Sequence, residues 1–212
     1  KIAFWSILFI LFFPTSFYFG SVYTEGLFFM MIVLSFYFFD KGNVLVAALI
    51  GAFSTATRLV GLFLLISMFN FKKIKQLLPL FLIPSGLFFY MLYLYISFKN
   101  PVYFLTGQAS FGQERSTSEL IFLPQVFYRY LKIFLTTSGF SLISAVTEFS
   151  ATVFALVTIF LAFRKKIKQE WIIFSLCSVL LPTLTGTLTS MPRYIIMAFP
   201  IFIYLGMLKS TI

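Results

Sequence analysis

The sequence contains no histidine and a single cysteine, Cys177. The chain therefore has no disulfide framework, no zinc site of the usual His/Cys kind, and no Ser-His or Cys-His nucleophile. Cys177 lies in the apolar run FSLCSVL, where a thiol packs as a small apolar group. Charged residues are also scarce, at 10% of the chain. An ordinary soluble domain has roughly 25%, so that class is excluded.

Apolar residues make up 60% of the chain, and the net charge is +10. The basic residues form short clusters between apolar segments, which indicates membrane topology and no nucleic-acid partner. The apolar runs cover residues 2–13, 25–39, 43–70, 77–97, 143–163, 171–188 and 193–208. We expect an all-α, polytopic transmembrane helical bundle of about six spans, with a short helical hairpin and an outer-face amphipathic helix. Residues 1–212 would form a single integral-membrane domain.

The run at residues 43–70 has two interpretations. As one straight helix it leaves Arg58 in mid-membrane, which is costly, and divides the other Lys and Arg residues eight against seven. As two short helices that enter and leave on the same side, it divides all 16 of them ten against six. Because cytoplasmic loops carry an excess of Lys and Arg, the hairpin with Arg58 at its tip is favoured.

The hairpin places four polar segments on the non-cytoplasmic face: PTSFYFGSVYTE, STATRLVG, the stretch from about residue 98 to 140, and LTGTLTSMPRY. The long stretch predicts an interfacial amphipathic helix, with Arg129 and Lys132 off an apolar face of Leu123, Phe127, Tyr130, Leu131 and Phe134. The cytoplasmic loops are short and contain no GxxxxGK[ST] motif. We therefore look for functional residues on the outer face.

Glu25 follows Pro14 and Tyr23 at the expected start of a helix. The helix dipole favours a carboxylate in the first turn, so Glu25 is either a helix-start charge or a carboxylate that orients a hydroxyl or pairs with an arginine.

Arg58, beside Thr57 and Gly61, presents a cation and hydroxyl donors at the expected hairpin tip. Guanidinium groups suit phosphate, which predicts a phosphate or substrate contact. A structural ion pair with Glu25 or Glu148 is the alternative.

Pro192 suits the start of a helix and places Arg193 and Tyr194 in its first turn. A cation there opposes the helix dipole, so either an anion compensates it or Arg193 extends to lipid headgroups. The loop KNPVYFLTGQASFGQER adds Gln108 and Arg115 among aromatic residues, a mixture found in carbohydrate sites and in ordinary solvated loops.

Together these segments resemble the PIG-V family, the second mannosyltransferases of GPI-anchor assembly and their prokaryotic relatives, within the GT-C superfamily of polytopic glycosyltransferases. The resemblance is carried by Pro14 with Tyr23-Thr24-Glu25, by Ala56-Thr57-Arg58 followed by Gly61, by NPVYFLTGQASFGQER, and by Pro192-Arg193-Tyr194 followed by Phe199-Pro200. Each motif is short, but their order and spacing extend over nearly the whole chain.

The resemblance implies transfer of a hexose, with mannose expected, from a polyprenyl- or dolichyl-phosphate carrier to a hydroxyl of a glycolipid, glycan or protein on the outer or lumenal face. Glu25 would position the acceptor or an arginine. The expected phosphate- or substrate-binding residues are Arg58, Thr57, Arg193, Tyr194, Tyr23, Gln108 and Arg115.

GT-C enzymes place a catalytic Asp or Glu in the first outer loop, which would precede Lys1. We therefore expect the chain to be a fragment without the first span and that loop. No cofactor is indicated, and a divalent metal is left open. The protein would lie in the plasma membrane of a prokaryote or the endoplasmic reticulum of a eukaryote, in contact with membrane lipids. A transporter or lipid flippase, or a noncatalytic membrane fragment, is the alternative.

Overall fold

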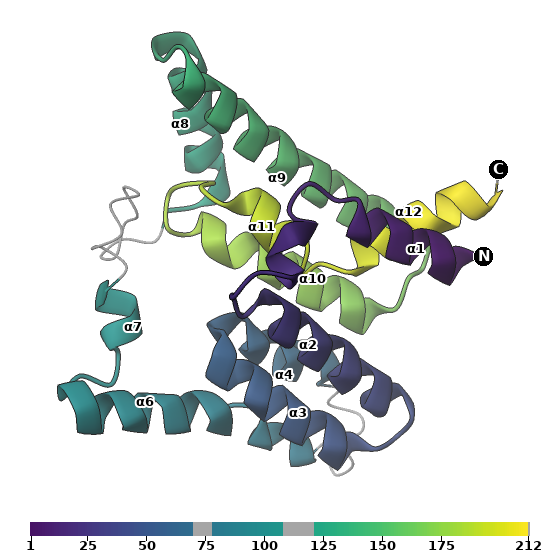
Figure 1. Cartoon of the computed structure of the whole chain (residues 1–212). Coiled ribbons are helices and arrows are strands. Elements are labelled where there is room, and N and C mark those ends of the chain that lie inside the picture. Colours follow the sequence, from purple (N-terminus) through teal and green to yellow (C-terminus); the bar gives the residue numbers. More distant parts are fainter. Residues whose placement is uncertain (70–77, 108–120, 212) are drawn as a thin grey trace. The chain divides into compact units, whose positions relative to one another are not determined.

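The computed structural model describes residues 1–69, 78–107 and 121–211, and every regular element in these ranges is a helix. The expected all-α class is therefore confirmed. The chain divides into two compact units, each described by itself (Figure 1). The first unit combines Lys1–Phe17 with Thr106–Ile212, and the second unit is Tyr18–Leu105. The expectation of a single membrane domain stays a prediction.

The second unit is built from short helices that pack through small side chains. Its elements are α2 (Glu25–Asp40), α3 (Val44–Thr57), η2 (Leu59–Leu62), α4 (Phe63–Met68), η4 (Leu78–Leu82) and α6 (Ser85–Phe98), with η1 (Ser16–Phe19) and α7 (Tyr103–Thr106) at its ends. Gly42, in the left-handed region (φ 82°), turns the chain from α2 into α3. Ala47 and Ala48 of α3 are fully buried, and the Ser35 hydroxyl donates to the Ala47 carbonyl at 2.8 Å. Small residues of this kind let two helix backbones approach closely.

The apolar run at residues 43–70 contains the expected break at Arg58. Arg58 has extended backbone (φ −151°, ψ 136°), so α3 ends before it and η2 follows. The chain then folds back so that η2 and α4 lie against α3. Two glycines show how close this contact is: a Cβ on Gly61 would lie 2.6 Å from the Ser54 hydroxyl, and a Cβ on Gly51 would contact Leu64 of α4 at 3.5 Å. The interpretation as two short helices is therefore correct in its local geometry.

The first unit is arranged around one long helix, α9. Its elements are α1 (Ile2–Leu11), α8 (Leu123–Thr136), α9 (Phe140–Arg164), α10 (Gln169–Thr183), α11 (Met191–Ile195) and α12 (Pro200–Thr211). Helices α8, α10, α11 and α12 all contact α9. The first and last helices of the chain lie side by side, with Gly206 against Ser6 (Figure 1). Phe174 and Phe202 are fully buried in this unit.

One expectation about the first unit is wrong. The apolar run at residues 193–208 is not one helix: α11 ends at Ile195 and α12 begins at Pro200. Pro200 has no N–H to donate to the carbonyl four residues earlier, so a continuous helix would be broken there. In α8, Val126 is fully buried and Leu131 is 54% exposed. The helix itself is present as predicted.

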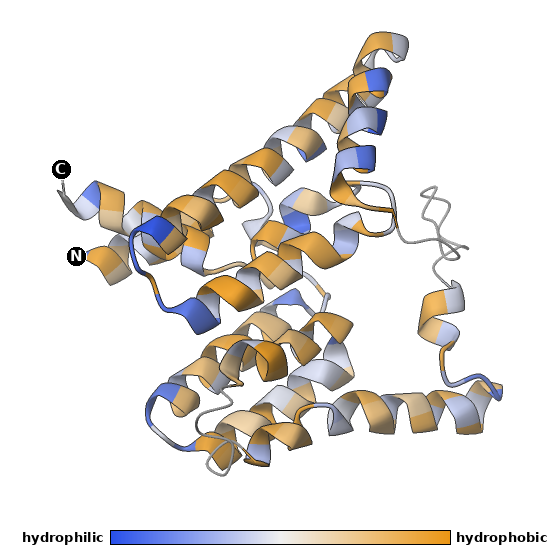
Figure 2. Cartoon of the chain, turned by 180° about the vertical axis from the view of Figure 1, so that it is seen from behind, coloured by the Kyte–Doolittle hydropathy of each residue, from blue (hydrophilic) through white to orange (hydrophobic). Residues whose placement is uncertain are grey.

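Among the residues that the structure describes, two helical segments, Leu78–Phe98 and Phe140–Arg164, are long and apolar enough to cross a membrane. Only 22% and 28% of their most apolar stretches are buried, so most of these side chains face outward. Hydrophobic residues predominate along the ribbons of α6 and α9 (Figure 2). The same described ranges contain five further apolar helices of 10–17 residues, which are shorter than the span of about 20 residues that a bilayer requires.

Candidate functional site

Glu25 and Arg58 form a buried ion pair in the second unit. The Arg58 Nη1 atom lies 2.5 Å from the Glu25 Oε1 atom. The side chain of Glu25 is fully buried, and that of Arg58 is 17% exposed. The ion pair with Glu25, which was one of the two interpretations of Arg58, is therefore present in the structure.

Local structure brings these two side chains together. Glu25 is the first residue of α2, where the helix dipole favours a carboxylate. Arg58 directly follows α3, which packs against α2. Phe28 lies one turn after Glu25, and its ring centroid is 5.9 Å from the guanidinium carbon of Arg58. One face of α2 thus holds the guanidinium by a carboxylate and an aromatic ring.

Thr57 and Tyr23 are close to this pair in sequence but have other contacts. The Thr57 hydroxyl donates to the Ser54 carbonyl at 2.7 Å, within its own helix. Tyr23 is 57% exposed, and its ring packs edge-on against Tyr18 at 5.4 Å between centroids.

The remaining predicted residues belong to the first unit or are not described. Arg193 and Tyr194 lie in α11, whose start carries Pro192 as expected. The Thr15 hydroxyl donates to the Pro192 carbonyl at 2.9 Å, which ties this start to the segment after α1. Gln108 and Arg115 lie outside the described residues. The Glu25–Arg58 ion pair belongs to the second unit, whereas Arg193 and Tyr194 belong to the first, so the two sets are described separately.

A second polar cluster, centred on Tyr130 and Glu148, lies in the first unit. The Tyr130 hydroxyl donates to Glu148 Oε2 at 2.6 Å and accepts the Leu188 N–H at 3.0 Å. The Thr187 hydroxyl lies 3.5 Å from the same phenol oxygen. The cluster therefore joins α8, α9 and the loop between α10 and α11.

The environment keeps Tyr130 neutral. Burial, and then its hydrogen bond to Glu148, raise the pKa of Tyr130 to about 12. Beside it, Arg129 Nη1 donates to the Gly186 carbonyl at 3.1 Å. Gly186 has a positive φ of 83°, and a Cβ there would lie 2.5 Å from the side chain of Ile121, so the loop beside this cluster requires a glycine.

Because its pKa is raised, Tyr130 donates its hydrogen bond to Glu148 at any physiological pH.

Sequence reasoning considered Glu148 only as a partner for Arg58 and placed Tyr130 simply on an apolar face. A signal for this cluster was present, because Glu148 is the one acidic residue in the apolar run at residues 143–163. An ionisable residue in such a run is by default a candidate functional residue, and it needs a polar partner.

Within the described ranges, no group of three or more Asp, Glu or Cys side chains is placed to hold a metal ion. Compared with protein-family models, curated proteins and solved structures, the chain had no significant match.

Proposed function

We propose that this chain is a multi-pass membrane glycosyltransferase of the GT-C type. It would move a hexose, with mannose expected, from a polyprenyl- or dolichyl-phosphate carrier to an acceptor hydroxyl on the outer or lumenal face. The acceptor would belong to a glycolipid, glycan or protein. The observation that carries the proposal is the Glu25–Arg58 pair, which holds a guanidinium at a helix break. The resemblance of four ordered sequence motifs to the PIG-V family supports it.

In the proposed multi-pass arrangement, the two long apolar helices would cross the membrane together with the shorter apolar helices. A helix broken within the membrane is tolerated where its freed backbone groups meet protein or a polar cavity. Arg58 lies at a helix break, which the proposal places at the tip of a hairpin on the outer face.

The pair suits the binding of a carrier phosphate. A guanidinium has five N–H donors in a planar fork, and the bond to Glu25 uses one terminal nitrogen, Nη1. Glu25 would orient the guanidinium, and Arg58 would bind phosphate oxygens of the carrier. Glu25 is therefore proposed as a positioning residue and Arg58 as a substrate-binding residue.

In the proposed reaction the acceptor oxygen forms a bond to the anomeric carbon, and its proton passes to a carboxylate base. The bond between the anomeric carbon and the phosphate oxygen breaks, and the phosphate leaves with the electron pair. Negative charge therefore grows on the phosphate, and fixed cations lower the barrier by stabilising it. We propose Arg58 for this role.

The test is an Arg58→Lys variant of the full-length protein, assayed in membranes with radiolabelled polyprenyl-phosphate mannose. Lysine keeps a cation opposite Glu25 but lacks the planar fork. We expect transfer to fall by about 10²–10³-fold, the typical effect of removing one charge-stabilising donor. Arg164→Lys, at an exposed position at the end of α9, is the matched control and should transfer normally.

Membrane insertion and far-UV circular dichroism of both variants should match the unchanged protein. Full transfer by Arg58→Lys would refute the phosphate assignment. If the unchanged protein moves labelled sugar across the membrane and forms no product, the protein is a transporter.

A further inference from the structure

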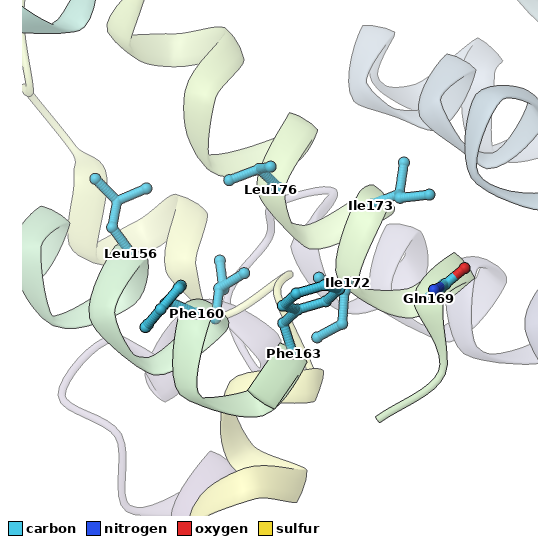
Figure 3. Close-up of a pocket in the computed structure, with 8 residues that line it drawn as sticks. Leu156, Phe160, Phe163, Gln169, Ile172, Ile173 and Leu176 are labelled. Atoms are coloured by element: carbon cyan, nitrogen blue, oxygen red, sulfur yellow. The ribbon is translucent and has the colours of Figure 1, made fainter. Parts of the chain in front are cut away.

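The turn between α9 and α10 is bordered by two adjoining hollows in the first unit. The first hollow has a volume of about 360 Å³ and is lined almost wholly by apolar side chains. Leu156 and Phe160 of α9 and Ile173 and Leu176 of α10 line it, with Gln169 at its polar end (Figure 3). Phe160 is 58% exposed and Ile173 is 39% exposed, so these linings are accessible.

The second hollow has a volume of about 610 Å³ and is cationic. Arg164, Lys166 and Lys168 line it, and it shares Phe163 and Gln169 with the apolar hollow. The two hollows therefore adjoin, one apolar and one positively charged. Figure 2 shows the same change, from hydrophobic helices to a hydrophilic connecting turn.

The basic side chains of this turn are exposed and concentrated. Residues 164–168 read Arg-Lys-Lys-Ile-Lys, and all four cations are exposed. Within the described part of the chain, Arg164 and Lys166 form no ion pair with an acidic side chain. Lys166 has left-handed backbone (φ 57°), which is costly for a non-glycine residue and bends the turn sharply. Arg164 and Lys166 thus present exposed positive charge beside an apolar hollow.

We propose that this double hollow is a binding site for an acidic phospholipid of the surrounding bilayer. One acyl chain would lie in the apolar hollow, and the headgroup phosphate would lie among Arg164, Lys166 and Lys168. Basic surfaces next to membrane helices attract anionic headgroups by charge. A basic loop that only sets the membrane topology needs no apolar hollow next to its cations. The apolar hollow beside this turn therefore favours a lipid site. The inference rests on the membrane placement in the proposed function, and it does not depend on glycosyl transfer.

Tryptophan fluorescence gives a local test. The chain has two tryptophans, and Trp171 lies in the first turn of α10, beside Gln169 and Ile172 of the apolar hollow. A Trp5→Phe background leaves Trp171 as the one fluorescent indole. The full chain would be reconstituted with phosphatidylcholine bilayers containing increasing fractions of phosphatidylglycerol brominated on its acyl chain. Quenching of Trp171, compared with brominated phosphatidylcholine, reports the preference for the acidic lipid.

We expect phosphatidylglycerol to be preferred and Arg164→Gln/Lys166→Gln to lower that preference by about 25-fold, since each basic residue near the membrane is worth about fivefold. Lys72→Gln/Lys73→Gln removes the same charge from another basic cluster of the sequence and should leave the preference unchanged. An equal loss in both double variants would mean a general charge effect only and would overturn the site.

The apolar half of the site is tested without changing charge. Ile173→Asn places a polar group on the accessible wall of the hollow. We expect it to weaken binding of brominated phosphatidylglycerol, measured by quenching, at least about tenfold, which is the fold-change that about 1.5 kcal/mol for covering one such side chain corresponds to. Unchanged quenching would mean that no acyl chain occupies the hollow. Equal quenching of the unchanged protein by the two lipids would likewise refute the proposal.

Discussion

The Glu25–Arg58 pair leads to a prediction about asymmetric stability. Arg58→Met removes the cation and leaves a carboxylate that is fully buried. Removing one partner of a buried ion pair costs about 3–5 kcal/mol, because the other charge loses its compensation. Glu25→Gln instead leaves an arginine whose side chain is 17% exposed and can extend toward water or headgroups. We expect this change to cost only about 1–2 kcal/mol.

The double variant Glu25→Gln/Arg58→Met isolates the interaction between the two groups. With the buried carboxylate neutralised, the loss of Arg58 no longer leaves an isolated charge. The double variant should therefore be more stable than Arg58→Met alone, with a coupling energy of about 2 kcal/mol or more between the two changes.

The free energy of unfolding can be measured in mixed micelles by titrating sodium dodecyl sulfate and following helix content by far-UV circular dichroism. Helix content is a suitable signal because every regular element in the described ranges is a helix. Equal costs for Arg58→Met and Glu25→Gln, with additive effects in the double variant, would refute the reasoning. Such a result would mean that the two charges do not interact in the folded protein.

Two further predictions concern packing and a buried phenol. A Cβ on Gly86 would lie 1.7 Å from the Ala52 carbonyl, so Gly86→Ala should destabilise the second unit by about 1–3 kcal/mol or more. Gly107→Ala, whose added Cβ meets nothing within 4 Å, should have little effect, and thermal unfolding compares the two. Tyr130→Phe should cost about 1–3 kcal/mol, because Glu148 and the Leu188 N–H lose their partner. The folded pKa of about 12 lies above the ordinary 10.0, so the neutral phenol stabilises the fold below pH 10 and this contribution is lost as pH rises toward 12. The stability difference between the unchanged protein and Tyr130→Phe should shrink over that range, and a constant difference would contradict the assignment.

Several features of the fold could be predicted because they depend on neighbours along the chain. Glu25 begins a helix because a carboxylate is favoured there, and Pro192 lies at the start of α11 because its missing N–H has no partner in a first turn. The helix break at Arg58 followed from the cost of a charge inside a straight apolar helix. The break before Pro200 was missed, although proline in a long apolar run is itself a local signal.

The candidate site was predictable in its residue types and less so in its contacts. Arg58 had two acidic residues as conceivable partners, Glu25 and Glu148. The structure pairs it with Glu25, which is 33 residues away in sequence, and pairs Glu148 with Tyr130. Which side chains meet depends on how each helix is rotated against its neighbour, and the sequence pattern does not contain that rotation.

The sequence by itself determined that the protein is apolar and rich in helices, and it identified the scarce polar residues that need partners. These conclusions follow from composition and short-range spacing, since the cost of an unpaired charge in an apolar run does not depend on the fold. Only the tertiary structure decided the partners: the Arg58 guanidinium against Glu25 and Phe28, and the Tyr130 phenol against Glu148. It also revealed the apolar and cationic hollows beside the α9–α10 turn, because a hollow exists only where side chains from two helices surround the same space.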